Sequence, residues 1–188
     1  MALKGQYTTA DHLSWDQYQL LLMKLSRDGR FKDATIIALA VNTLLRFSDF
    51  SKITWADILD NEVLQIQETK TGKVRRIKVN NELRSTVVKT VAKESVADLD
   101  KPIVNFSIQY LNRLLKDIKV KYSLNVRNLS THSFRKTAGR RIAEKHQFSG
   151  EVLLMLMDLF NHSSLAITKR YLGIRQEEIE SLYDELAL

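Results

Sequence analysis

The stretch THSFRKTAGRRIAEKHQFSGEVLLMLMDLFNHSSLAITKRY, residues 131–171, decides how the rest of the chain is interpreted. The reactive side chains of this stretch lie near its two ends: His132 and Arg135 at the start, and His162 and Tyr171 at the end. An imidazole can move protons, a guanidinium can bind an anion and a phenol can act as a nucleophile. Together these side chains are suited to chemistry at a phosphodiester.

The start of this stretch predicts a helix. Ser130 and Thr131 are residue types that cap helices, so the first helical turn is expected to begin here. His132 and Arg135 are three residues apart and would lie on one face of that turn. Both side chains could then point at one anion.

The far end of the stretch requires a break between its two groups. Tyr171 follows His162 by nine residues, which is about 900° of rotation in a continuous α-helix and would place them on opposite faces. The conflict disappears if His162 lies in a turn before a helix capped by Ser163 or Ser164. Tyr171 alone would then lie on that helix.

These residues resemble the catalytic end of the tyrosine recombinases, the phage integrase family. The resemblance rests on HSFR at 132–135, on LFNHSS at 159–164 and on YL at 171–172. An H-x-x-R box alone would be weak, but the combination with this spacing is specific. It implies a mainly α fold with a small antiparallel β-sheet, the catalytic-domain fold of that family, over roughly residues 10–186. It also implies an upstream arginine and a lysine in a β-hairpin.

Arg46 is the predicted upstream arginine, in the run LLRFSD at 44–49 that closes an apolar helix expected at about 32–47. A charge beside so apolar a segment is costly unless it is paired, and an ion pair with Asp49 is the ordinary structural explanation. The run resembles the family's first arginine box, usually Gly-x-Arg-x-x-Glu, with Leu44 for glycine and Asp49 for glutamate. The resemblance implies that Asp49 keeps the charge that orients Arg46, whereas the loss of glycine concerns the local backbone.

Residues 63–79 change to a period of two and predict a β-hairpin. Leu64 and Ile66 alternate with polar residues, and the run TKTGK at 69–73 has the composition of a turn. Lysines at such a tip are usually only solvated. The resemblance implies that one of them acts as a general acid, and Lys70 is favoured over Lys73.

The remaining pattern predicts four more helices, at about 15–27, 81–93, 107–121 and 151–160. They accompany the apolar helix expected at about 32–47. Ile179, Leu182 and Tyr183 share one stripe, so residues 174–188 are predicted to form an acidic amphipathic helix. Docking of this helix on its own body or on a neighbouring protomer stays open. The whole chain, residues 1–188, is expected to be a single catalytic domain with an N-terminal segment at 1–13 and no separate N-terminal DNA-binding domain.

The composition predicts a polyanionic partner. The net charge of the chain is +7, and residues 174–188 hold one arginine and five acidic residues, so residues 1–173 carry +11. There are no cysteines, which excludes disulfides and thiolate metal sites. No apolar run approaches the ~18 residues of a membrane span.

The resemblance implies a site-specific DNA recombinase or integrase that cuts and rejoins double-stranded DNA through a 3′-phosphotyrosyl intermediate. The implied catalytic set is Arg46, Lys70, His132, Arg135, His162 and Tyr171. No cofactor is expected, and no metal, since cationic side chains would supply the charge stabilisation.

The same resemblance implies self-association on DNA as a synaptic tetramer, accessory DNA-bending proteins, and a place with the nucleoid in the cytoplasm of a bacterium or phage host. Two alternatives are a catalytically silent DNA-binding protein of the same fold and a type IB topoisomerase-like activity.

Overall fold

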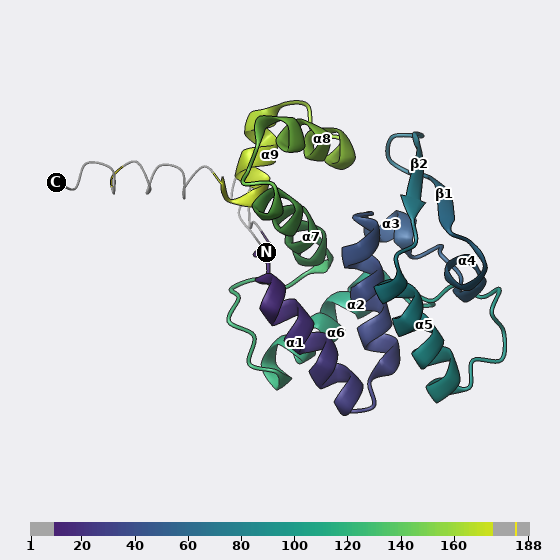
Figure 1. Cartoon of the computed structure of the whole chain (residues 1–188). Helices are drawn as coiled ribbons and strands as arrows, with labels where there is room; N and C mark the ends of the chain where they lie inside the picture. The colour runs from purple at the N-terminus through teal and green to yellow at the C-terminus, as the bar shows by residue number, and fades with distance from the viewer. Residues whose placement is uncertain (1–9, 175–182, 184–188) are drawn as a thin grey trace. The chain divides into compact units, whose positions relative to one another are not determined.

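The protein is described by a computed structural model that covers residues 10–174 and residue 183 (Figure 1). This part of the chain is mostly helical with one two-stranded antiparallel sheet, so the predicted fold class is confirmed. The elements are α1 (Trp15–Arg27), α2 (Phe31–Thr43), α3 (Phe47–Phe50), α4 (Trp55–Asp60), β1 (Val63–Gln67), β2 (Val74–Lys78), α5 (Asn81–Glu94), α6 (Ile108–Lys121), α7 (Thr131–Lys145), α8 (Gly150–Phe160) and α9 (Leu165–Leu172).

The chain divides into two compact units, and the division falls inside α7. Among the described residues, the large unit comprises residues 10–137 and the small unit comprises residues 138–174. The expectation of a single catalytic domain stays a prediction. Within residues 10–174, no helix is both long and apolar enough to cross a membrane.

Helix α2 forms the centre of the large unit, between α1 and α5 (Figure 1). Every residue from Ala34 to Val41 is buried, as expected for a helix that is apolar nearly all round. The buried hydroxyl of Thr35 is 2.8 Å from that of Thr90 on α5, so the polar groups in this contact satisfy each other. Helix α1 begins at a capping box, in which the Ser14 side chain accepts from the Gln17 amide.

Helix α2 ends earlier than predicted. It stops at Thr43, because Leu44 adopts a left-handed conformation with φ of 52°. The Thr43 hydroxyl donates to the Leu39 carbonyl at 2.8 Å and accepts from the Leu45 amide at 3.4 Å, which satisfies part of the helix end. Arg46 therefore lies outside α2 and is the N-cap residue of α3, so the predicted helix to residue 47 was wrong at its end.

The predicted hairpin is confirmed, with β1 paired to β2 in the register Leu64 to Ile77. The side chains of this pair are buried, whereas those of the neighbouring pair Gln65 and Arg76 are exposed. Gly72 has a φ of 69° in the connecting turn, and its amide donates to the Glu68 carbonyl at 2.8 Å.

The small unit contains the end of α7 together with α8 and α9. Asn161 is left-handed with φ of 52° and ends α8, and the Ser164 side chain caps α9. His162 therefore lies in the turn and Tyr171 lies on the next helix, as predicted. The predicted C-terminal helix, residues 174–188, lies almost wholly outside the described residues, as does most of the N-terminal segment.

Candidate active site

The large unit brings Arg135 of α7 to the connection that carries Arg46. The Arg135 residue is only 4% exposed, and its Nε donates to the carbonyl oxygen of Leu44 at 2.8 Å. Leu44 precedes Arg46 by two residues, so this bond ties the start of α7 to the end of α2. Two guanidinium groups that are far apart in the sequence are thereby held in one region of the unit.

His132 lies one helical turn before Arg135, and the charges of Arg135 and Arg46 both affect its pKa. His132 is an exposed residue, yet partial desolvation, followed by the charges of Arg135 and Arg46, holds the pKa of His132 below its ordinary value of 6.5. The imidazole is therefore neutral at pH 7. A neutral imidazole can accept a proton, which is what a general base requires.

Arg46 pairs with a residue that the sequence did not indicate. Its Nη1 lies 3.3 Å from Oε2 of Glu68, a carboxylate at the end of β1. Asp49, the predicted partner, instead accepts from the backbone amide of Thr69 at 2.8 Å through Oδ1. In the described part of the chain its Oδ2 has no hydrogen-bond partner. The prediction that Asp49 pairs with Arg46 was therefore wrong: Asp49 fixes the hairpin turn, and Glu68 fixes the arginine.

The candidate general acids lie in that turn, where Lys70 and Lys73 are both exposed. The turn is anchored by neighbouring bonds: Thr71 Oγ1 donates to Glu68 Oε2 at 2.8 Å, and Lys52 Nζ donates to Thr69 Oγ1 at 2.9 Å. The preference for Lys70 stays a prediction, because exposure does not distinguish the two lysines.

In the small unit, His162 and Tyr171 contact each other through their rings. The ring centroids are 5.1 Å apart and the planes meet at 71°. Phe160, which is fully buried, packs against both rings, with centroids 5.3 Å from His162 and 5.0 Å from Tyr171. His162 Nδ1 is 3.0 Å from the Thr168 hydroxyl, which orients the imidazole.

The end of α9, directly after Tyr171, is held by Arg140. Its Nη1 donates to the Leu172 carbonyl at 2.9 Å, and its Nε donates to Glu144 Oε1 at 3.0 Å. Gly173 follows with φ of 77°, a left-handed cap of the helix. A cation at a helix C-terminus also complements the partial negative charge there. The sequence pattern gave no signal for Arg140, because its partner is a backbone carbonyl 32 residues away.

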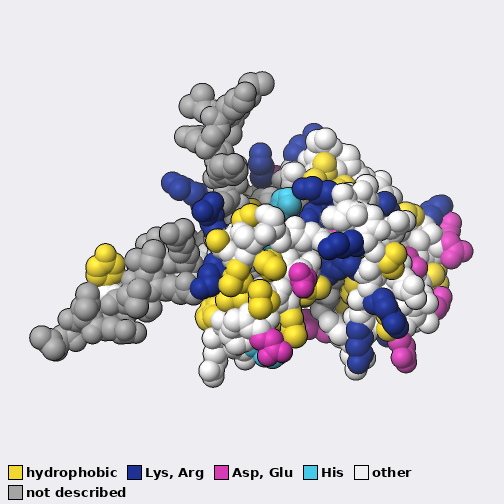
Figure 2. Space-filling model, turned by 90° about the horizontal axis from the view of Figure 1, so that it is seen from above, with side chains coloured by type: hydrophobic (Ala, Val, Ile, Leu, Met, Phe, Trp, Pro, Cys, Tyr) yellow, Lys and Arg dark blue, Asp and Glu magenta, His cyan; other side chains and the backbone are white. Residues whose placement is uncertain are grey.

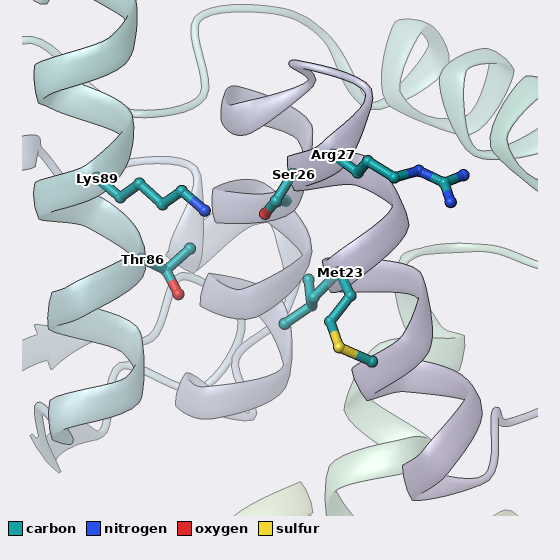
Figure 3. Close-up of a pocket in the computed structure, with 7 residues that line it drawn as sticks. Met23, Ser26, Arg27, Thr86 and Lys89 are labelled. Atoms are coloured by element: carbon teal, nitrogen blue, oxygen red, sulfur yellow. The ribbon is translucent and has the colours of Figure 1, made fainter.

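The structure thus gathers Arg46, His132 and Arg135 within the large unit and His162 and Tyr171 within the small unit. No group of three His, Asp or Glu side chains that could hold a metal ion occurs among the residues described. A groove of about 360 Å³ in the large unit is unrelated to these residues (Figure 3). It is lined by Leu22, Met23, Ser26, Arg27, Ala34, Thr86 and Lys89.

Known structures share this fold. The chain resembles the solved structure of XerA recombinase with a TM-score of 0.69 and 16% identity, over all of this chain and 67% of the other. It resembles the Tn1549 transposon integrase, solved in complex with transposon right end DNA, with a TM-score of 0.66 and 18% identity, over 96% of this chain and 68% of the other. The fold is therefore that of the tyrosine recombinase catalytic domains.

Sequence comparison agrees with the fold. A probable integrase/recombinase of Bacillus subtilis (strain 168), YoeC, is 26% identical over 159 residues, which is 81% of this chain and 83% of the relative. The model of the phage integrase family matches residues 12–178. The chain belongs to the phage integrase family, as the motifs in its C-terminal third predicted.

Proposed function

We propose that this chain is a site-specific DNA recombinase that cuts and rejoins strands through a 3′-phosphotyrosyl intermediate. The observation that carries the proposal is the ring contact between Tyr171 of α9 and His162 in the turn before that helix. The same chain places two buried or half-buried guanidinium groups, Arg46 and Arg135, near His132. Membership of the phage integrase family and the resemblance to recombinases support it.

The reaction exchanges one phosphodiester for another. The phenolic oxygen of Tyr171 attacks the scissile phosphorus, a tyrosyl oxygen–phosphorus bond forms, and the bond to the 5′-oxygen breaks. A free 5′-hydroxyl leaves with the proton that it gains. The attack of a 5′-hydroxyl from another strand reverses these changes, so no external energy source is needed.

Each remaining residue has a role that its chemistry fits. Arg46 and Arg135 stabilise the extra negative charge on the non-bridging oxygens, since each guanidinium can donate two parallel hydrogen bonds and stays protonated. His162 donates a further bond. His132 takes up the proton of Tyr171, a role that the lowered pKa of its imidazole favours.

Lys70 protonates the leaving 5′-oxygen in this scheme. Its position in an exposed turn suits a group that reaches the bound strand. The roles of all six residues are proposals.

Double-stranded DNA is the proposed partner. Residues 1–173 carry a net charge of +11, and Figure 2 shows Lys and Arg side chains on the visible face with a His ring among them. A lambda integrase dimer has been solved on a core site, and the Tn1549 integrase on transposon DNA. Assembly of a synaptic tetramer, the use of accessory DNA-bending proteins and a place at the nucleoid belong to the same proposal.

The test is trapping of a covalent adduct. The protein is incubated with nicked DNA substrates from which the short fragment that bears the free 5′-hydroxyl is lost after cleavage, and the adduct is resolved on a denaturing gel. Tyr171→Phe should abolish the adduct and leave DNA binding in a gel shift nearly unchanged, because only the nucleophilic oxygen is lost. Tyr110→Phe, at an exposed tyrosine of the large unit, is the matched control and should form the adduct normally.

An adduct formed by the Tyr171→Phe protein would refute the assignment of the nucleophile. EDTA should not slow adduct formation, and a loss that added divalent ions restore would contradict the charge-stabilisation scheme. Relaxation of supercoiled DNA by a lone protomer would favour the topoisomerase-like alternative.

A further inference from the structure

Glu68 occupies an unusual position for a carboxylate at the end of an exposed hairpin strand. Its side chain is 1% exposed, and each of its oxygens is engaged. Oε2 accepts from Arg46 Nη1 at 3.3 Å and from Thr71 Oγ1 at 2.8 Å, and Oε1 accepts from Arg75 Nη1 at 3.2 Å. One buried carboxylate therefore links α3, the hairpin turn and β2.

The backbone of Glu68 also closes the turn that carries Lys70. Its amide donates to the Lys73 carbonyl at 2.9 Å, and its carbonyl accepts from the Gly72 amide at 2.8 Å. Lys70 lies between these bonds, beside Thr71, whose hydroxyl is held by the Glu68 side chain. The position of the Lys70 backbone therefore depends on Glu68 through three hydrogen bonds.

The charge of Glu68 is retained inside the protein. Burial opposes ionisation, but the hydrogen bonds from Thr71 and Arg75, with the charges of Arg75 and Arg46, outweigh it and hold the pKa of Glu68 below its ordinary value. A buried carboxylate between two guanidinium groups fixes the position of both, because leaving any of the three charges unpaired is costly.

We infer that Glu68 is a positioning residue that holds the turn of Lys70 in register with Arg46, so that the general acid and the phosphate-binding arginine address the same phosphodiester. This inference rests on the proposed function. Lysine carries its charge on a flexible four-carbon stem, so the position of the turn backbone determines whether the Lys70 ammonium group can reach the leaving 5′-oxygen. A general acid must come within about 2.6–3.2 Å of the atom that it protonates.

Replacement of the 5′-bridging oxygen by sulfur separates this role from a purely structural one. A thiolate leaves without a proton, so the sulfur substrate reports cleavage that does not need the general acid. The measured quantity is the ratio of single-turnover adduct rates, sulfur substrate over oxygen substrate. Lys70→Ala should raise this ratio by roughly 10²- to 10⁴-fold, the usual contribution of a general acid.

Arg46→Ala should slow both substrates and leave the ratio unchanged, because Arg46 acts on the non-bridging oxygens while Thr71 and Arg75 still hold the Glu68 carboxylate. Glu68→Gln keeps the size of the side chain and removes its charge. It should slow cleavage of the oxygen substrate by about 10²-fold and raise the ratio at least about tenfold, as expected from a displaced acid. Glu62→Gln, at an exposed glutamate just before β1, is the matched control and should change neither rate.

A Glu68→Gln protein that melts normally, and whose two rates fall by the same factor, would overturn the inference. If this variant does not fold, Thr71→Val provides the second test, because it removes only the hydroxyl bond between the turn and Glu68. An unchanged ratio in Thr71→Val would then overturn it. Failure of the proposed function looks different, since the wild-type protein would form no adduct with either substrate.

Discussion

Gly139 is the point at which the smallest substitution should disturb Tyr171, the proposed nucleophile. It lies in α7 where this helix meets α8 and α9. A Cβ added here would lie 2.4 Å from Phe160 Cζ and 3.1 Å from Leu172 Cδ2. Phe160 and Leu172 are fully buried, so neither side chain can move into solvent.

The effect of Gly139→Ala on stability can be bounded from these contacts. Alanine gains about 1 kcal/mol over glycine in a helix interior, whereas an extra carbon in a packed core costs about 1–3 kcal/mol. The net loss is therefore between about 0 and 2 kcal/mol. For a chain of this size it lowers Tm by at most about 8 °C, at 2–4 °C per kcal/mol.

Gly139→Ala should affect the rate of adduct formation more strongly than it affects stability. Ordinary contact begins near 3.4 Å, so the Phe160 ring must move by roughly 1 Å, a displacement that can cost about 10²-fold in rate at a catalytic group. Because Phe160 packs against both His162 and Tyr171, the displacement reaches the nucleophile. Adduct formation should slow by about this factor, with DNA binding unchanged.

The matched control is Gly150→Ala at the first residue of α8, where an added Cβ meets nothing within 4 Å. It should keep the wild-type cleavage rate and be as stable as the wild type or slightly more stable. Thermal melts and single-turnover adduct rates are measured for both variants. A Gly139→Ala protein that cleaves at the wild-type rate would refute the inference that Phe160 places the rings of His162 and Tyr171 for cleavage.

Three further outcomes follow from the charges. The pKa of His132 is lowered from its ordinary value of 6.5, so single-turnover rates should fall on the acid side with a midpoint below pH 6.5; a midpoint above pH 6.5 would exclude His132 as its source. Arg140→Leu removes the bond to the Leu172 carbonyl, and should lower the free energy of unfolding by about 1.5–3 kcal/mol and slow adduct formation while DNA binding stays intact in a gel shift. The folded-state pKa of Glu68 lies below its ordinary 4.5, so its contribution to stability is present above that pH and is lost as the pH falls through the folded value; Tm should therefore depend less on pH in this range for Glu68→Gln.

The parts of the fold that were predictable have local causes. The break between His162 and Tyr171 followed from the helical period together with the cap residue Ser164, and both act within a few residues. The hairpin at 63–78 followed from alternation and from turn chemistry around Gly72. Helix α1 and its capping box at Ser14 were likewise determined by neighbours in the sequence.

The partner of Arg46 could not be predicted in this way. Asp49 was expected to be the partner because it lies three residues from Arg46 and stands at the acidic position of the arginine box, whereas no pattern in the sequence indicated Glu68. Arg46 is 22 residues from Glu68, and the pair forms because the hairpin returns the end of β1 to α3. Asp49 accepts a hydrogen bond from the amide of Thr69 in the hairpin turn. Asp49 therefore binds the hairpin, and Glu68 binds Arg46.

Leu44 shows how the local backbone is arranged where the first arginine box lacks its usual glycine. A leucine in the left-handed region costs about 1–2 kcal/mol, and such a conformation persists only where its surroundings impose it. In a continuous helix the Leu44 carbonyl would accept from the amide four residues later. The left-handed turn directs this oxygen to Arg135 Nε instead, at 2.8 Å. The helix end therefore creates the acceptor that ties Arg135 to the connection that carries Arg46.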